Sequence, residues 1–164
     1  FVTSKDIFFF LFIFAWIFVH RKHVQMDTEL IEQAKQATFT SYSPYSNFKV
    51  GAAVRMSDGR IFTGSNQENA AYSACLCAER VALLYACANA EGSYPTSIAI
   101  AAFQNGDFTE NIITPCGECC QVLAEMQNRF GHEITVYLYG KNETKIVKSA
   151  KDLLPLAFEL GVKW

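Results

Sequence analysis

The chain has 164 residues, and its 14 Lys and Arg against 16 Asp and Glu give a net charge of −2. This balance, without a long basic run, argues against a nucleic-acid partner, because phosphate binding normally requires a basic patch. The length suits one domain with a hydrophobic core, and the sequence holds no internal repeat or Pro-rich linker. We therefore expect a single compact domain that does not bind nucleic acid.

The first 25 residues differ in composition from the rest of the chain. Half of the 14 phenylalanines lie in residues 1–18, and every residue from Ile7 to Val19 is apolar. A bilayer-spanning helix needs about 20 such residues, so this run is too short, and no small-residue cleavage site follows it. A helical pattern begins just after Met26. We expect residues 1–25 to be an extension outside the fold, residues 26–164 to form the domain, and no membrane partner unless the extension is a genuine part of the protein.

The first half of the domain reads as a helix followed by a hairpin. Apolar residues at helical spacing predict a helix over 30–37, which Asp27 and Thr28 can cap. A turn-rich stretch over 41–47 ends it. Strands are predicted over 48–56 and 60–64, joined by a Ser-Asp-Gly turn.

The second half alternates helices with strands. A helix is predicted over 77–89, then a strand over 97–103 whose continuous apolar run is typical of burial on both faces. Further elements are predicted in this order: a helix over 116–130, strands over 134–139 and 145–148, and a last helix over 152–160. Such alternation is typical of an α/β domain layered around a mainly buried sheet.

All six cysteines follow Met26 and gather mainly in two short stretches: Cys75, Cys77, Cys87, Cys116, Cys119 and Cys120. Disulfide frameworks belong mostly to shorter, loop-rich secreted chains. The distribution instead indicates metal or redox chemistry in a reducing compartment, and we expect the protein to be cytoplasmic.

Cys77, Cys116 and Cys119 each lie where a predicted helix begins. A helix N-terminus favours thiolate over thiol, so two converging helix starts would present three metal ligands. Three protein ligands plus a water are the arrangement of a catalytic zinc, whereas structural zinc normally has four. Glu79 stands close enough to Cys77 to reach the water, and Arg80 would offset the negative charge of the thiolates.

Four motifs occur together in the order and spacing of one enzyme family: FKVGAA over 48–53, NQENAAY over 66–72, CAER over 77–80 and PCGEC over 115–119, followed by Gln121. The sequence resembles the small homotetrameric zinc-dependent cytidine deaminases over about residues 26–160. Leu153, Leu154, Pro155 and Phe158 resemble the C-terminal segment of that family. The resemblance implies a three-layer α/β/α fold with a mixed sheet of about five strands.

The resemblance also implies roles for individual residues. Cys77, Cys116 and Cys119 would hold one zinc per subunit, and Glu79 would transfer protons between the zinc-bound water and the pyrimidine. The substrate-binding residues would be Phe48, Asn66, Glu68, Ala70, Tyr72 and Ala78, with Phe48 on the pyrimidine face and Asn66 and Glu68 at the ribose hydroxyls. Phe158 would close the site of a neighbouring subunit in a homotetramer.

Two positions depart from the family pattern. Cys120 stands where Arg is common, and Cys75 stands where Gly is common. The loss of a cation beside the thiolates alters the local electrostatics, and a thiol next to Cys119 is open to oxidation. Neither departure touches a ligand or Glu79.

The residues also permit other interpretations. The three cysteines could be buried small hydrophobes, a structural zinc site that recruits Cys75, or, for Cys116 and Cys119, a redox dithiol. The C-x-C spacing of Cys75 and Cys77 is not the usual one of a structural zinc site, and a redox dithiol leaves Cys77 and Glu79 without a role. We expect hydrolytic deamination of cytidine and 2′-deoxycytidine in pyrimidine salvage. The alternatives are a deaminase of cytosine nucleoside antibiotics of the blasticidin type and a zinc-bound binding or redox module without hydrolysis.

Overall fold

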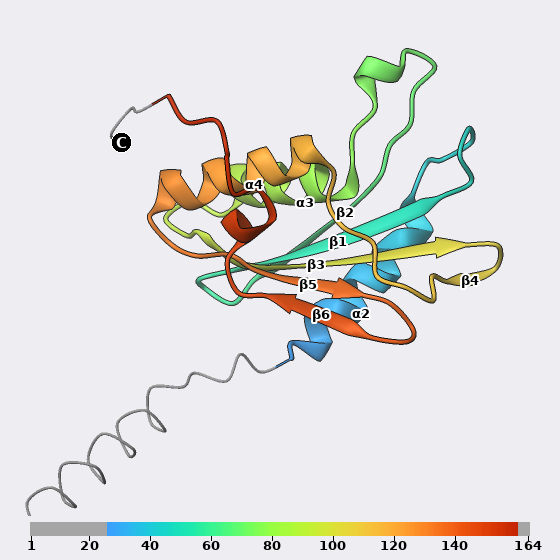
Figure 1. Cartoon of the computed structure of the whole chain (residues 1–164), viewed down its shortest axis with the longest axis horizontal. Helices are drawn as coiled ribbons and strands as arrows, with labels where there is room; N and C mark the ends of the chain where they lie inside the picture. Colours follow the sequence, from blue (N-terminus) through green and yellow to red (C-terminus); the bar gives the residue numbers. More distant parts are fainter. Residues whose placement is uncertain (1–25, 161–164) are drawn as a thin grey trace, which may run out of the picture.

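The computed structural model describes residues 26–160, and the strands of this part form a single six-stranded sheet (Figure 1). The helices are α2 (Thr28–Ala37), α3 (Ala78–Asn89) and α4 (Gly117–Phe130), and short 3₁₀ helices are η1 (Thr38–Thr40), η2 (Tyr72–Ala74) and η3 (Ala150–Leu153). The strands are β1 (Lys49–Met56), β2 (Ile61–Ser65), β3 (Pro95–Gln104), β4 (Asp107–Phe108), β5 (Thr135–Tyr139) and β6 (Thr144–Val147). The strand order is β2-β1-β3-β5-β6, and β4 pairs with β3. Only β3 and β5 run parallel, so the sheet is mixed.

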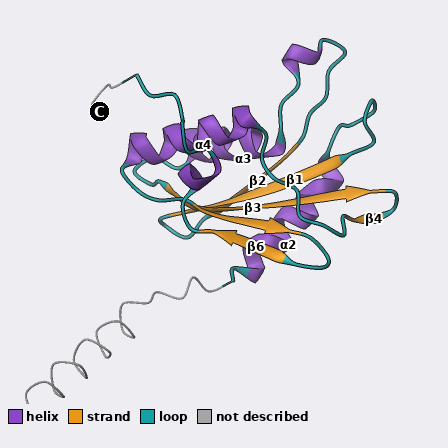
Figure 2. Ribbon diagram, in the orientation of Figure 1, coloured by secondary structure: helices purple, strands orange, loops and turns teal. Residues whose placement is uncertain are grey.

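Helices cover both faces of the sheet, with α2 on one face and α3 and α4 on the other (Figure 2). Because side chains alternate between the faces of a strand, neighbouring residues of one strand belong to different cores. Val54 and Ile98 pack toward α3 and α4, whereas Ala53 and Ala99 pack against α2. Strand β3 is thus buried on both faces, as its apolar sequence predicts. The predicted three-layer α/β/α fold is confirmed.

Glycine allows α2 to lie directly on the sheet at one point. A Cβ atom at Gly51 of β1 would contact the carbonyl oxygen of Ala34 and lie 2.6 Å from the backbone nitrogen of Thr38. The glycine of the FKVGAA motif is therefore required for the close packing of α2 on β1.

Three details differ from the predictions. The helix predicted over 152–160 is wrong: η3 ends at Leu153, and no helix follows as far as residue 160. Pro155 disfavours helical backbone at Leu154, and the exposed Leu156 and Leu160 have no core to pack against. Strand β4 and helix η2 were too short to predict from patterning, and β4 brings the sheet to six strands instead of about five.

The prediction about residues 1–25 lies outside the described residues. Among residues 26–160, no helix combines the length and apolar character needed to cross a membrane.

Candidate functional site

Three cysteine sulfurs come together where α3 and α4 begin. Cys77 and Cys116 are the N-cap residues of these helices, both in extended conformation, and Cys119 lies in the first turn of α4. The sulfur of Cys116 is 3.9 Å from that of Cys77 and 3.6 Å from that of Cys119, and all three lie within 4.8 Å of one another. The sequence predicted this convergence because each cysteine stands at a helix start.

The spacing of these sulfurs fits zinc. With a Zn–S bond of about 2.3 Å and tetrahedral angles, two sulfur ligands stand about 3.8 Å apart. The observed separations of 3.6 and 3.9 Å bracket this value, and three thiolates leave one position open for water. The donor set is thus suited to a catalytic metal with an open coordination position.

The charges around the thiols favour a thiolate at Cys77. Hydrogen bonds from Cys119, Cys116 and Arg80, of which that from Cys119 is the strongest, together lower the pKa of Cys77 to about 5 although burial opposes this. The same contact with Cys77, together with burial, raises the pKa of Cys119. Metal binding must therefore displace protons from the remaining thiols, which makes it dependent on pH.

Glu79 is buried beside the thiols, in the first turn of α3, with 5% of its surface exposed. Burial raises the pKa of this carboxyl group, and the charge of Cys77 adds to the effect. A raised pKa makes the carboxylate a stronger base, which favours the transfer of a proton to it from a nearby water, as a proton shuttle requires.

Arg80 connects the two helix starts. Its Nη1 lies 3.0 Å from Oε2 of Glu118, and its Nη2 donates a hydrogen bond of 3.1 Å to the carbonyl oxygen of Cys75. Its Nε is buried without a hydrogen-bond partner among the described residues. The guanidinium also faces Cys77 and lowers the pKa of that thiol. The role of Glu118 as a partner of Arg80 was not predicted from the sequence.

A cavity of about 400 Å³ opens next to Cys77. Its lining includes three of the predicted substrate-binding residues, Asn66, Glu68 and Tyr72, and the predicted zinc ligand Cys77. The other lining residues are Tyr45, Ser46, Gln67, Cys75 and Leu76. The rings of Tyr45 and Tyr72 meet edge to face with their centroids 6.2 Å apart. Tyr45 and Gln67 were not predicted as site residues. Gln67 lies within the NQENAAY motif, and Tyr45 stands shortly before the FKVGAA motif.

Asn66 and Glu68 are held by hydrogen bonds to residues 45–50, which precede β1 and form its start. The side chain of Asn66 accepts from the backbone nitrogen of Val50 at 2.8 Å and donates to the carbonyl oxygen of Phe48 at 2.9 Å. Glu68 accepts from the backbone nitrogen of Tyr45 at 2.8 Å and from the hydroxyl of Ser46. The bond from Ser46 lowers the pKa of Glu68 and keeps its carboxylate ionised. Both side chains therefore link two segments that border the cavity.

The other predicted residues lie around this centre without lining the cavity. Phe48 is half-buried before β1, Ala70 is exposed, and Ala78 is buried as the first residue of α3. Phe158 lies in the C-terminal segment with 68% of its surface exposed. Cys120 is buried, and its sulfur lies 3.6 Å from the carbonyl oxygen of Pro115 instead of joining the three clustered sulfurs.

Comparisons with known proteins agree with this geometry. The profile of the "cytidine and deoxycytidylate deaminase zinc-binding region" matches residues 24–131. A cytidine deaminase of Sporosarcina psychrophila is 42% identical over 135 residues, which cover 81% of this chain and 92% of that protein. One of Halalkalibacterium halodurans is 43% identical over 130 residues, which cover 79% and 91%.

Solved structures show the same likeness in three dimensions. The cytidine deaminase of Burkholderia pseudomallei superposes with a TM-score of 0.69 at 41% identity, over 82% of this chain and 100% of that chain. The cytidine deaminase of Mycobacterium tuberculosis gives a TM-score of 0.64 at 33% identity, over 83% and 100%. With its fold, its cysteine arrangement and its sequence all in agreement, the chain belongs to the cytidine and deoxycytidylate deaminase family of zinc-binding proteins.

Proposed function

We propose that the protein hydrolyses cytidine and 2′-deoxycytidine to uridine and 2′-deoxyuridine with release of ammonia. One observation carries the proposal: three cysteine sulfurs with the spacing of zinc ligands lie beside a buried glutamate and a cavity large enough for a small molecule. The relatives named as cytidine deaminases supply the substrate class.

Cys77, Cys116 and Cys119 would hold the zinc. Bound there, it supplies a water of lowered pKa as the nucleophile for C4 of the cytosine ring. Glu79 accepts a proton from that water and passes it to ring nitrogen N3 as the C–O bond forms. Glu79 would then take the proton of the new C4 hydroxyl group and give it to the 4-amino group, so that the C–N bond breaks, ammonia leaves and C4 becomes a carbonyl carbon while N3 keeps its proton. The raised pKa of Glu79 supports both transfers because burial makes the carboxylate a stronger proton acceptor than an exposed one.

The cavity next to Cys77 would bind the nucleoside. Asn66 has one amide hydrogen beyond its bond to Phe48, and the ionised Glu68 has acceptor capacity beyond its bonds to Tyr45 and Ser46. These groups would bind the ribose hydroxyls, and a ligand without the hydroxyls would leave them unpaired. Phe48 would pack on the pyrimidine, and Ala70, Tyr72 and Ala78 would complete the binding segment.

Arg80 would support the metal-bound thiolates electrostatically. Its guanidinium faces Cys77 and has a buried Nε without a partner among the residues described, so it can add a charge-assisted contact to a thiolate.

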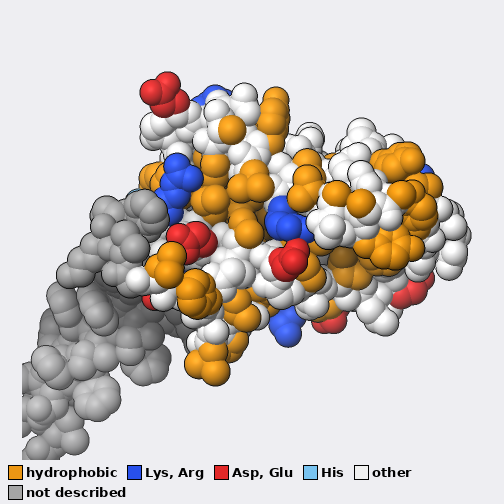
Figure 3. Space-filling view, turned by 90° about the horizontal axis from the view of Figure 1, so that it is seen from above, with side chains coloured by type: hydrophobic (Ala, Val, Ile, Leu, Met, Phe, Trp, Pro, Cys, Tyr) orange, Lys and Arg blue, Asp and Glu red, His pale blue; other side chains and the backbone are white. Residues whose placement is uncertain are grey.

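A homotetramer would complete the site, with Phe158 closing the cavity of a neighbouring subunit. Figure 3 shows the side of the molecule that carries α3 and α4, where hydrophobic side chains are spread over the surface and charged ones are few. Leu84 and Tyr85 of α3 are about half exposed, at 48% and 56%. Such a surface favours association with further copies of the chain.

We place the reaction in pyrimidine salvage in the cytoplasm. All six cysteines, which lie within the described residues, are free thiols, as is usual in a reducing compartment.

The test is to incubate the purified, zinc-loaded protein with cytidine and to follow both ammonia and the change in ultraviolet absorbance. Turnover is expected with cytidine and with 2′-deoxycytidine. Absence of turnover in protein with one zinc per subunit would refute the proposal. Preferential turnover of a blasticidin-type nucleoside would assign the protein to antibiotic inactivation instead.

A further inference from the structure

The C-terminal segment is fastened to α4 by one side chain. Gln121 Nε2 donates a hydrogen bond of 2.8 Å to the carbonyl oxygen of Phe158, and the backbone nitrogen of Phe158 donates one of 3.0 Å to Gln121 Oε1. A single amide group thus satisfies both peptide groups of one residue. Figure 1 shows the segment rising from η3 and crossing α4 before it reaches the end of the described chain.

Within residues 26–160, few other contacts hold Phe158 in place. Leu156, Phe158 and Leu160 are 95%, 68% and 79% exposed, so apolar burial within this chain contributes little to the position of the segment. The next residue, Glu159, accepts from Asn128 Nδ2 at 3.0 Å and pairs with Lys151 at 3.2 Å, but these contacts are exposed and involve only its side chain. The two bonds from Gln121 are therefore the principal restraint on the backbone of Phe158.

Gln121 also lies on the helix that carries two of the metal-binding cysteines. Cys116 is the N-cap of α4, and Cys119 lies two residues before Gln121. A restraint from Gln121 fixes Phe158 relative to a helix that is anchored in the core, because Cys119 and Leu123 of the same helix are buried.

We propose that Gln121 is a positioning residue that presents Phe158 to the substrate cavity of a second copy of this chain. The inference rests on the proposed function, in which Phe158 closes the cavity of a neighbouring subunit. Without the two hydrogen bonds the C-terminal segment adopts other positions, and the substrate loses its contact with the ring of Phe158. Substrate binding is then weakened, while the groups that carry out the chemical step are unchanged. The effect is therefore expected in KM and not in kcat.

The first test replaces Gln121 with Met, which has a similar length but cannot form either hydrogen bond. We expect the KM for cytidine to rise by about five- to tenfold, as the loss of two modest hydrogen bonds predicts, with kcat within about twofold of wild type. Asn128→Ala is the matched control, because it removes a contact to the side chain of Glu159 and leaves the backbone of Phe158 held. An unchanged KM in Gln121→Met, or an equal rise in Asn128→Ala, would overturn the proposal.

A double-mutant cycle separates positioning from a general structural effect. If Gln121 acts through Phe158, then Gln121→Met adds nothing to the KM of Phe158→Ala. If the fold-increases in KM of the two single variants multiply in the double variant, Gln121 acts independently of Phe158.

Hydrogen exchange tests the restraint without any substrate. The amide of Phe158 is expected to exchange faster in Gln121→Met than in wild type and at the wild-type rate in Asn128→Ala. Equal exchange in all three proteins would refute the restraint even in an active enzyme. If the amide of Phe158 exchanges faster in Gln121→Met but the wild-type protein does not deaminate cytidine, the proposed function is refuted and the restraint is still supported.

Discussion

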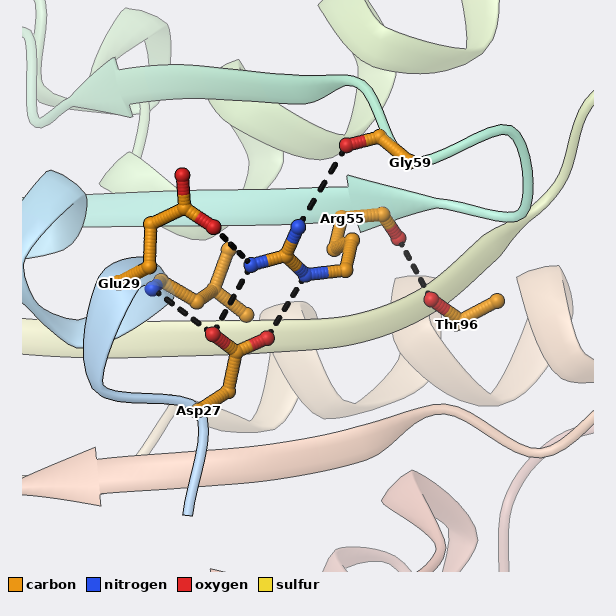
Figure 4. A network of polar contacts seen from close by, with 6 residues as sticks. Asp27, Glu29, Arg55, Gly59 and Thr96 are labelled. Atoms are coloured by element: carbon orange, nitrogen blue, oxygen red, sulfur yellow. Dashed lines mark hydrogen bonds and ion pairs between the residues drawn. The ribbon is translucent and has the colours of Figure 1, made fainter. Parts of the chain in front are cut away.

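Arg55 and Asp27 form a two-point ion pair that fastens α2 to the sheet (Figure 4). Arg55 Nε donates to Asp27 Oδ2 at 2.7 Å, and Nη2 donates to Oδ1 at 2.9 Å. The same Oδ1 accepts from the backbone nitrogen of Leu30 at 3.0 Å, so Asp27 is also the N-cap of α2. One carboxylate therefore begins a helix and connects it to β1.

Asp27→Ala is expected to lower the free energy of unfolding by about 2 kcal/mol, because it removes a helix cap and leaves a partly buried Arg55 without its main partner. Denaturant unfolding monitored by circular dichroism measures this loss. Glu29→Gln is the matched control: Glu29 also contacts Arg55 at 2.8 Å, but its side chain is 68% exposed, so a loss well below 1 kcal/mol is expected. Equal losses in the two variants would contradict the dual role of Asp27.

The contribution of Asp27 also depends on pH. Burial acts to raise the pKa of Asp27, but the hydrogen bonds from Arg55 and Leu30 outweigh it and hold the pKa below its ordinary value of 3.8. A carboxyl group with a lowered folded-state pKa stabilises the fold above its unfolded pKa and loses this effect as the pH falls through the folded value. The difference in unfolding free energy between wild type and Asp27→Asn should be constant near neutral pH and shrink only below about pH 4. A difference that already shrinks at pH 6 would show that another group is responsible.

Gly51→Ala should destabilise the fold strongly, by more than about 2 kcal/mol, because the new methyl group would overlap backbone atoms of α2 that cannot move independently. Thermal unfolding of the variant measures the effect. Gly117→Ala is the control, since a Cβ at the first residue of α4 meets nothing within 4 Å, and its unfolding temperature should not fall. Similar unfolding temperatures for wild type and Gly51→Ala would mean that α2 packs less closely on β1.

Much of the fold was predictable because its signals are local. Asp27 marks the start of α2, and the apolar run of β3 indicates a strand buried on both faces. The parallel pairing of β3 with β5 was not predictable from patterning, because it depends on contacts between segments separated by α4. The last predicted helix failed because leucines at suitable spacing form a helix only where a core receives them, and Leu156 and Leu160 are exposed.

The candidate site also combines features that were predictable from the sequence with features that were not. Cys77 and Cys116 could be placed together because both precede helices, and the structure brings their sulfurs within 3.9 Å. The structural use of Asn66 was not predictable, since its partners Phe48 and Val50 come from a different strand end. Glu118 was missed because its only signal is its distance from Arg80 in the folded chain.

Cys116→Ser is expected to lower the zinc content to well below one per subunit and to abolish deamination, because hydroxyl is a poor zinc ligand compared with thiolate. Metal analysis after dialysis against a weak chelator measures the content. Cys120→Ser is the matched control, because the sulfur of Cys120 lies apart from the three clustered sulfurs, and it should keep its zinc. Loss of zinc in Cys120→Ser alone would reassign the ligand set.

Glu79→Gln is expected to keep zinc and to lower kcat by at least about 100-fold, since the amide cannot accept and return a proton. The measurement is steady-state deamination with metal analysis of the same sample. Glu118→Gln, which makes the same chemical change on a side chain that is 74% exposed, should retain most of the activity. A full rate in Glu79→Gln would exclude the proton-shuttle role even if the protein deaminates cytidine.

Arg80→Gln should move the acidic limb of the pH dependence of kcat/KM to higher pH, by less than about one unit. The positive charge of Arg80 lowers the pKa of both Glu79 and Cys77, so its removal lets each group hold its proton to higher pH. Glu118→Gln removes the anion that lies 3.0 Å from Arg80, and it should move the same limb in the opposite direction by a smaller amount, because solvent screens the exposed Glu118. Opposite shifts in the two variants would identify an electrostatic effect of Arg80, whereas a fall in rate without any shift of the limb would show that Arg80 only holds the two helix starts together.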